Sequence, residues 1–197
     1  MRKIHRQLQI YYHIINTEYH SPKDLMREFG MGQRTLQRDL EDLRHCGLLY
    51  LKYNRKKDNY LDADPGKFKK PVKIKERRRQ HLKLLHRLGT LMRNLTVTDH
   101  QKLTEYESLL WEYYYYIELV EEDPVEFPPE DIGELPERPE FADTKAEYYE
   151  LFPESNERTR ARDFATLTEA GFTVKYSRRH RAFLVGPDID PGEERHW

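Results

Sequence analysis

Two stretches of this chain repeat one pattern of arginine, threonine and aspartate residues. "GQRTLQRDLEDLRHCG" begins at Gly32, and "NERTRARDFATLTEAG" begins at Asn156. Both contain R-T-x-x-R-D, then an apolar residue, two further residues and L-x-x-x-G. Arginine can bind O6 and N7 of guanine as a fork, and glutamine can bind N6 and N7 of adenine in the same way. The repeated pattern therefore indicates helices that read base edges in the major groove of DNA.

The candidate DNA-binding residues lie near the N-terminus of each predicted helix, the end that enters the groove in a helix-turn-helix protein. They are Gln33, Arg34, Thr35, Gln37 and Arg38 in the first stretch and Arg158, Thr159 and Arg162 in the second. Asp39 is acidic, so we expect it to hold an arginine in place and not to face DNA. A solvated helix face is the alternative for the first set. For the second set, with Glu154 and Glu157 at the helix start, the alternative is a degenerate copy used for packing or dimer contacts.

The similarity between the two stretches continues beyond the helix. After one gapped position, "KYNRKKDNYL" from Lys52 aligns with "KYSRRHRAFL" from Lys175. Each reads as a strand, a basic turn and a return strand. The turns supply further candidate DNA contacts, Arg55, Lys56 and Lys57 in the first copy and Arg178 and Arg179 in the second. An internal duplication is therefore predicted. For the basic residues of the turns, the alternative to DNA contact is a role in solubility alone.

The predicted fold class is mainly α with small β-hairpin wings, an α+β arrangement. Helices are expected over residues 2–16, 22–29 and 33–46, and strands over 48–53 and 60–63. Ser21 and Pro22 form a helix start, because serine caps and proline suits the first helical position. Three helices followed by a hairpin is the winged helix-turn-helix order. In the second copy the first helix is not adjacent, and is either supplied by residues 98–120 or absent.

The remaining sequence predicts connecting regions. The expected order is a winged helix-turn-helix at 1–64, a basic linker at 65–75, a helical hairpin at 76–121, an acidic Pro-rich linker at 122–142, a second winged-helix-like unit at 143–187 and a tail at 188–197. Apolar residues recur in steps of three and four along the second helix of the hairpin, which predicts a dimer interface. They are Leu103, Tyr106, Leu110, Tyr113 and Ile117.

Charge is strongly segregated although the net charge of the chain is −1. Residues 1–97 carry 23 Lys and Arg against 10 Asp and Glu, whereas residues 98–152 carry 3 against 17. The basic run between Lys67 and Lys83 is expected to contact phosphates, which adds affinity without sequence preference. The acidic stretch is either a solubilising spacer or a segment that folds onto the basic surface and competes with DNA.

Catalysis and membrane insertion find no support in the sequence. The single cysteine, Cys46, permits no intrachain disulfide, and we expect a cytoplasmic, nucleoid-associated location. No apolar run approaches the roughly 20 residues that span a bilayer. The nine histidines show no metal-ligand spacing, and no Gly-rich phosphate loop occurs. We therefore predict no enzyme activity, no catalytic residues, no metal and no cofactor.

The stretch "SPKDLMREFGMGQRTLQRDLEDLRHCGL" resembles the N-terminal DNA-binding domain of DeoR-type and WYL-type bacterial transcription regulators. The resemblance covers residues 3–63 well and 143–186 in part. Gly32 stands where the family usually has a serine cap, and no effector domain is expected, so ligand sensing is not implied. The resemblance implies a sequence-specific regulator of transcription that binds double-stranded DNA, and repression is favoured over activation. The apolar seam implies that the chain forms a homodimer. A plasmid or phage replication or partition protein and a winged-helix protein-interaction scaffold are the alternatives.

Overall fold

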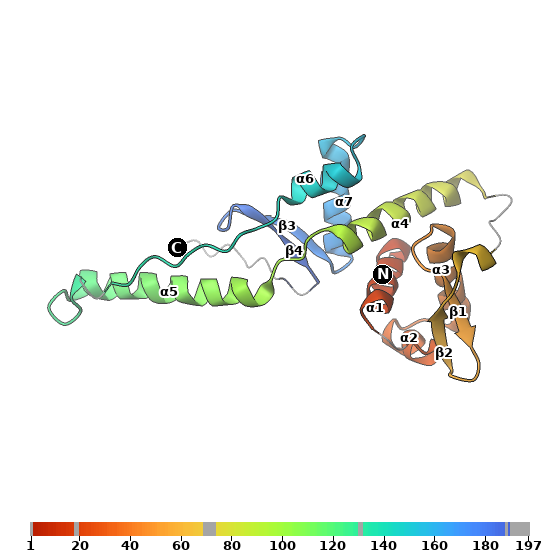
Figure 1. Cartoon of the computed structure of the whole chain (residues 1–197), viewed down its shortest axis with the longest axis horizontal. Coiled ribbons are helices and arrows are strands. Elements are labelled where there is room, and N and C mark those ends of the chain that lie inside the picture. The colour runs from red at the N-terminus through yellow and green to blue at the C-terminus, as the bar shows by residue number, and fades with distance from the viewer. Residues whose placement is uncertain (1, 18–19, 69–73, 130–131, 188, 190–197) are drawn as a thin grey trace.

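The computed structural model describes residues 2–17, 20–68, 74–129, 132–187 and 189. The fold is mainly helical, with two small antiparallel hairpins, as the α+β prediction requires (Figure 1). Lys69, Lys70 and Lys73 of the predicted basic run, and the tail from residue 190, lie outside the described residues. Within the described ranges, no helix combines the length and apolar character needed to cross a bilayer.

The first five elements form the N-terminal unit. They are α1 (Lys3–Asn16), α2 (Pro22–Glu28), α3 (Gln33–His45), β1 (Leu51–Asn54) and β2 (Asn59–Asp62), followed by a short 3-10 helix, η1 (Pro65–Lys67). The predicted start of α2 is confirmed, since Ser21 Oγ accepts the N–H of Asp24 at 3.0 Å and Pro22 is the first helical residue. The strands pair from Leu51 opposite Asp62 to Asn54 opposite Asn59.

A second set of elements follows the second copy of the pattern. It comprises α6 (Thr144–Leu151), α7 (Glu157–Glu169), β3 (Thr173–Ser177) and β4 (Ala182–Gly186). Helices α3 and α7 end in the same way, with Gly47 at φ 86° and Gly171 at φ 91°. The next amide in each copy bonds back to the carbonyl of Leu43 or Leu167 at 3.0 Å. Glycine suits both positions because it adopts positive φ without steric cost.

The two hairpins also correspond residue by residue. Their turns contain the only non-glycine residues with positive φ among those described, Asp58 at 46° and Arg181 at 48°. Each hairpin carries an aromatic pair across its strands. Tyr53 and Tyr60 have ring centroids 5.6 Å apart, and the rings of Tyr176 and Phe183 lie 5.4 Å apart. The two copies of the sequence pattern therefore share backbone conformation at corresponding positions.

The predicted helical hairpin is wrong. Helix α5 (His100–Glu122) does not fold back on α4 (Glu76–Asn94) but extends away from the body (Figure 1). The apolar face of α4 is already covered by α1, α3 and α7, and so offers α5 no surface. The chain leaves α4 in extended conformation, and Thr98 bonds to Val185 of β4 through its amide at 2.7 Å and its hydroxyl at 2.9 Å. This contact directs α5 past the second hairpin.

Helix α4 makes a contact with α7 that is similar to the contact of α1 with α3. In the N-terminal unit, α1 binds the buried Asp39 of α3 through Arg6 at 2.7 Å and Gln7 at 2.9 Å. In the second copy, α4 binds the corresponding Asp163 of α7 through Arg87 at 2.8 Å. The helix that contacts α7 in this way is α4, whereas the predicted residues 98–120 lie largely in α5. We call α4, α6, α7, β3 and β4 the C-terminal unit.

One hydrophobic core runs through both units, although the sequence predicted separate units joined by a linker. Leu8 and Tyr11 of α1, Leu88 of α4, Leu167 of α7 and Phe172 belong to one contiguous cluster. The ring of Tyr12 also lies 5.8 Å from that of Phe172. The close approach continues at Gly89, where a Cβ atom would lie 2.3 Å from a methyl carbon of Leu48. The two units are therefore packed together and not tethered.

Helix α5 and the described residues 123–129 and 132–142, which return beside it, form an arm (Figure 1). The return is fixed by ring contact between Tyr116 and Phe127 at 6.2 Å and by Phe141, which packs in a small core with Leu103 and Leu184. Arg138 donates a hydrogen bond to the carbonyl of His180. The acidic stretch thus lies along α5 and not on the basic hairpin of the N-terminal unit. Asp99 and Asp143 cap the N-termini of α5 and α6.

Candidate nucleic-acid interface

The outer face of α3 presents most of the first predicted set of DNA-binding residues together. Gln33, Arg34, Gln37 and Arg38 are exposed, and Thr35 is half-buried. Leu36, Asp39 and Leu43 lie on the opposite face and are buried. The sequence therefore separates α3 into a buried side that holds the helix and an outer side rich in arginine and amide groups.

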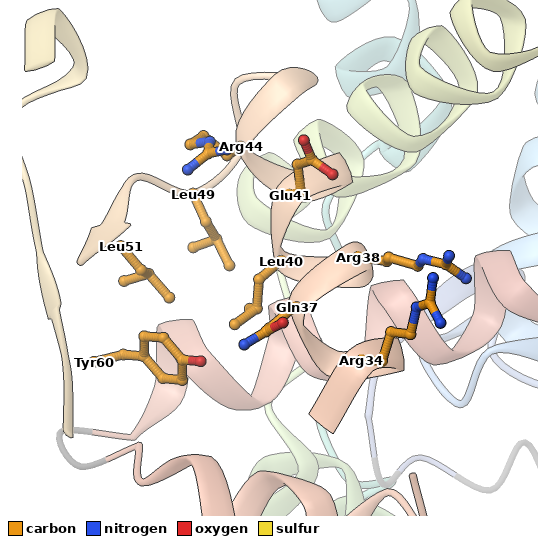
Figure 2. Close-up of a pocket in the computed structure, with 9 residues that line it drawn as sticks. All are labelled: Arg34, Gln37, Arg38, Leu40, Glu41, Arg44, Leu49, Leu51 and Tyr60. Carbon is orange, nitrogen blue, oxygen red and sulfur yellow. The ribbon is translucent and has the colours of Figure 1, made fainter. Parts of the chain in front are cut away.

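A hollow of about 500 Å³ lies between the outer face of α3 and the first hairpin (Figure 2). Figure 2 shows the guanidinium groups of Arg34 and Arg38 projecting from the same side of α3. The hollow is lined by Arg34, Gln37, Arg38, Leu40, Glu41, Arg44, Leu49, Leu51 and Tyr60. Its forked donors suit base edges, and its leucines suit the methyl group of thymine.

The tip of the first hairpin presents Arg55, Lys56 and Lys57, all exposed. The turn is fixed from within, because Asn54 Oδ1 accepts the backbone amides of Lys56 at 2.9 Å and Lys57 at 3.3 Å. The hydroxyl of Tyr53 donates to Asp58 at 2.5 Å. The three predicted basic residues are therefore held on an ordered turn.

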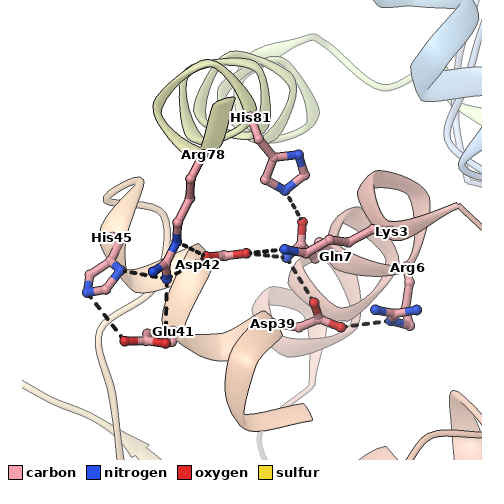
Figure 3. Close-up of polar contacts among 9 residues, drawn as sticks. All are labelled: Lys3, Arg6, Gln7, Asp39, Glu41, Asp42, His45, Arg78 and His81. Carbon is pink, nitrogen blue, oxygen red and sulfur yellow. Dashed lines mark hydrogen bonds and ion pairs between the residues drawn. The ribbon is translucent and has the colours of Figure 1, made fainter. Parts of the chain in front are cut away.

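Buried carboxylates of α3 bind side chains of α1 and α4 and so anchor the helix (Figure 3). As predicted, Asp39 holds an arginine, since Arg6 Nε donates to it at 2.7 Å. Asp42, which the sequence did not single out, accepts from Lys3 at 2.6 Å, Arg78 at 3.0 Å and Gln7 at 3.1 Å. Burial opposes ionisation of Asp42, but these hydrogen bonds outweigh it and hold the pKa of the carboxyl below its usual value. Helices α1 and α4 thus fix the orientation of α3.

The outer face of α7 differs from that of α3. Arg158 and Arg162 are exposed and Thr159 is half-buried, while the Asn156 side chain caps the helix by accepting the amide of Thr159 at 2.9 Å. Ala161 occupies the position of Gln37. Of the predicted turn residues in the second hairpin, Arg178 and Arg179 are both exposed. Arg179 also lies 3.6 Å from Glu107 of the arm.

The first two residues of the predicted dimer seam on α5 contact other residues of the same chain. Leu103 is buried against Leu184 and Ile189, and the ring of Tyr106 lies 6.2 Å from that of His180. Leu110, Tyr113 and Ile117 are half-buried. The second hairpin of the same chain therefore covers Leu103 and contacts half-buried Tyr106, and a dimer interface along α5 stays a prediction. Other aromatic residues of α5 are more exposed, among them Trp111 and Tyr115, which stack at 5.1 Å.

The comparisons with known proteins return no family. No family model, no curated protein and no solved structure matches this chain. In the part of the chain that the structure describes, no group of three or more His, Cys, Asp and Glu side chains is placed to hold a metal ion. Burial raises the pKa of Cys46 to about 12, and its thiol donates to the carbonyl of Leu43 at 3.2 Å. A thiol in this state is not a nucleophile at neutral pH.

Proposed function

We propose that this chain is a sequence-specific transcription regulator that binds double-stranded DNA, built from two winged helix-turn-helix units with α3 as the principal recognition helix. One observation carries the proposal. Arg34, Gln37 and Arg38 are all exposed on α3, where the two arginines project from the same side (Figure 2), while buried Asp39 and Asp42 anchor the helix. The resemblance of residues 3–63 to DeoR-type and WYL-type regulators agrees with this role.

In the proposed complex, the N-terminal end of α3 enters the major groove. Arg34 and Arg38 bind guanine through forked hydrogen bonds, and Gln37 binds adenine. Arg55, Lys56 and Lys57 bind phosphates on the flanking backbone. The network around Asp39 and Asp42 keeps α3 in one orientation, so binding requires ordering of its exposed side chains but not of the helix itself.

The proposal favours regulation in the cytoplasm, with repression as the expected effect. A protein that binds the origin of a plasmid or phage would use the same α3 surface. Genome-wide mapping of bound sites separates the two roles, because promoters are scattered whereas an origin forms one array. The homodimer predicted from the α5 seam is not part of the proposal, since Leu103 and Tyr106 pack within their own chain.

The test of base readout is alanine substitution of Arg34 and Arg38. Each change should weaken binding to a selected site by about 1–3 kcal/mol and weaken binding to random duplex less. Lys102→Ala, which removes an exposed cation from the arm, is the matched control and should leave both affinities unchanged. Equal losses on selected and random DNA would exclude base readout by α3.

A further inference from the structure

The two units pack against each other reciprocally. Helix α1 contacts α4, and each of these first helices also contacts the third helix of the other unit, α4 with α3 and α1 with α7. Arg78 of α4 pairs with Asp42 of α3 at 2.9 Å. On the other side, Arg2 of α1 pairs with Glu169 of α7 at 3.1 Å, and Gln9 donates to the carbonyl of Ala170 at 3.0 Å. Such mutual contacts are typical of an interface between two symmetry-related subunits.

This arrangement puts α3 and α7 in corresponding places of an internal pair. In symmetric helix-turn-helix dimers, two recognition helices bind two half-sites of one duplex. Here the two helices belong to one chain and differ in sequence, so each position of α3 has a natural comparison on α7. The differences between the two helices indicate which contacts, to bases or to phosphates, each one can make with its half of the binding site.

Helix α7 has arginines at the same positions as α3 but has no amide side chains where α3 has glutamines. Arg158 and Arg162 correspond to Arg34 and Arg38 and are exposed. The positions of Gln33 and Gln37 are taken by Glu157 and Ala161. An alanine methyl group cannot form the paired hydrogen bonds that identify adenine.

The exposed carboxylate of Glu157 and the neighbouring Glu154 disfavour deep entry of the α7 N-terminus between phosphates. In contrast, the strands and turn of the second hairpin expose Lys175, Arg178 and Arg181, which suit the DNA backbone. The C-terminal unit thus has cations for phosphate contact but lacks the amide groups that identify adenine.

We infer that the C-terminal unit binds the DNA backbone beside the sequence that α3 reads, so that the binding site has one information-rich half and one half held through phosphates. The inference rests on the proposed function. It assigns Gln37 as a specificity-determining residue without a counterpart, and Arg158 and Arg162 as affinity residues.

The experiment is selection of bound sequences from a random duplex library, with footprinting of the selected site. The wild-type protein should select a single information-rich block and protect a flanking half outside it. The matched variants are Arg158→Ala with Arg162→Ala, and Arg34→Ala with Arg38→Ala. The α7 pair should lower affinity equally on selected and random DNA and reduce the salt slope by about 2, because two phosphate contacts are lost, while the selected block stays the same. The α3 pair should erase the block.

Three results would overturn the inference: a second block of equal information, protection that ends at the half read by α3, or an α7 double variant with wild-type affinity and salt slope. Failure of the proposed function looks different, since the wild-type protein would then bind no duplex even at low salt. Circular dichroism melts of both double variants check folding, and all four arginines are exposed, so no loss of structure is expected.

Discussion

Arg160 occupies on α7 the buried position that Leu36 occupies on α3. Its guanidinium lies over the ring of Phe164, and Nη2 donates to Glu157 at 3.1 Å. Its Nε and Nη1 atoms are buried and make no hydrogen bond within the described part of the chain. Buried donors without partners cost about 1–3 kcal/mol of stability. At this position the C-terminal unit therefore carries two unsatisfied donors, where the N-terminal unit has the apolar Leu36.

Arg160→Leu should stabilise the protein, because it copies the residue that the N-terminal unit uses at this position. The expected gain in the free energy of unfolding is about 1–3 kcal/mol, measured by urea denaturation. Arg162→Leu, two positions along on the exposed face, is the control and should change stability by less than about 0.5 kcal/mol. A destabilised Arg160→Leu variant would mean that the guanidinium has a stabilising partner and that its donors are satisfied.

Asp39→Ala and Asp163→Ala should each lower the free energy of unfolding by about 2–4 kcal/mol, because each leaves charged or polar partners unpaired in the interior. Asp163 is fully buried between Arg87 and Tyr148, whose hydroxyl donates to it at 2.8 Å. Since one core joins both units, each variant should still unfold in a single transition. Circular dichroism and hydrogen exchange measure that unfolding. Two separate transitions in the Asp163 variant would contradict the shared core.

Stability should fall between pH 7 and pH 5. Burial lowers the pKa of His20, His45, His81 and His180. Their folded-state pKa values thus lie below about 6.5, the value of an unfolded histidine. As the pH falls through that value, the unfolded chain takes up protons that the folded chain does not, and folding weakens. Urea denaturation at several pH values measures the slope.

His81→Gln should make that slope shallower. In the folded protein, His81 Nε2 lies 2.7 Å from Gln7 Oε1. The amide of Gln7 already donates to Asp39 and Asp42, so the histidine is the donor in this contact, and a glutamine could donate in its place. An unchanged slope in this variant would show that His81 does not contribute to the pH dependence.

Replacing Arg55, Lys56 and Lys57 together with alanine should weaken DNA binding to all sequences alike. If each residue neutralises one phosphate, the slope of log affinity against log salt should fall by about 3. Salt titrations on selected and random duplex provide the measurement. A loss restricted to the selected site would instead assign the hairpin tip to base readout in the minor groove.

The local elements followed from the sequence because their signals are local. The Ser21 cap, the apolar spacing of α3 and the glycine at position 47 each depend on neighbouring residues, and the repeat transferred the same pattern to α7. The burial of Arg160 also had a signal, since it aligns with Leu36 in the repeat.

The pairing of elements could not be predicted in the same way. An apolar stripe shows that a helix is covered but not by what, so α4 and α5 were paired with each other. In the structure α4 joins α7, and the returning segment around Phe127 packs on α5. Buried Asp42 was missed for a similar reason, because its partners Lys3 and Arg78 come from helices 39 and 36 residues away in sequence.

Because α1 and α4 pack against each other within one chain, dilution does not separate the two units. Two separate subunits dissociate when their concentration falls below the dissociation constant of the dimer, and occupancy of a shared site then rises with the square of protein concentration. Here one polypeptide carries both units, so their pairing is intramolecular and persists at any concentration at which the chain is folded. A cell holding only a few copies would therefore hold them all as complete pairs, and occupancy of a binding site would rise in simple proportion to copy number until the site saturates.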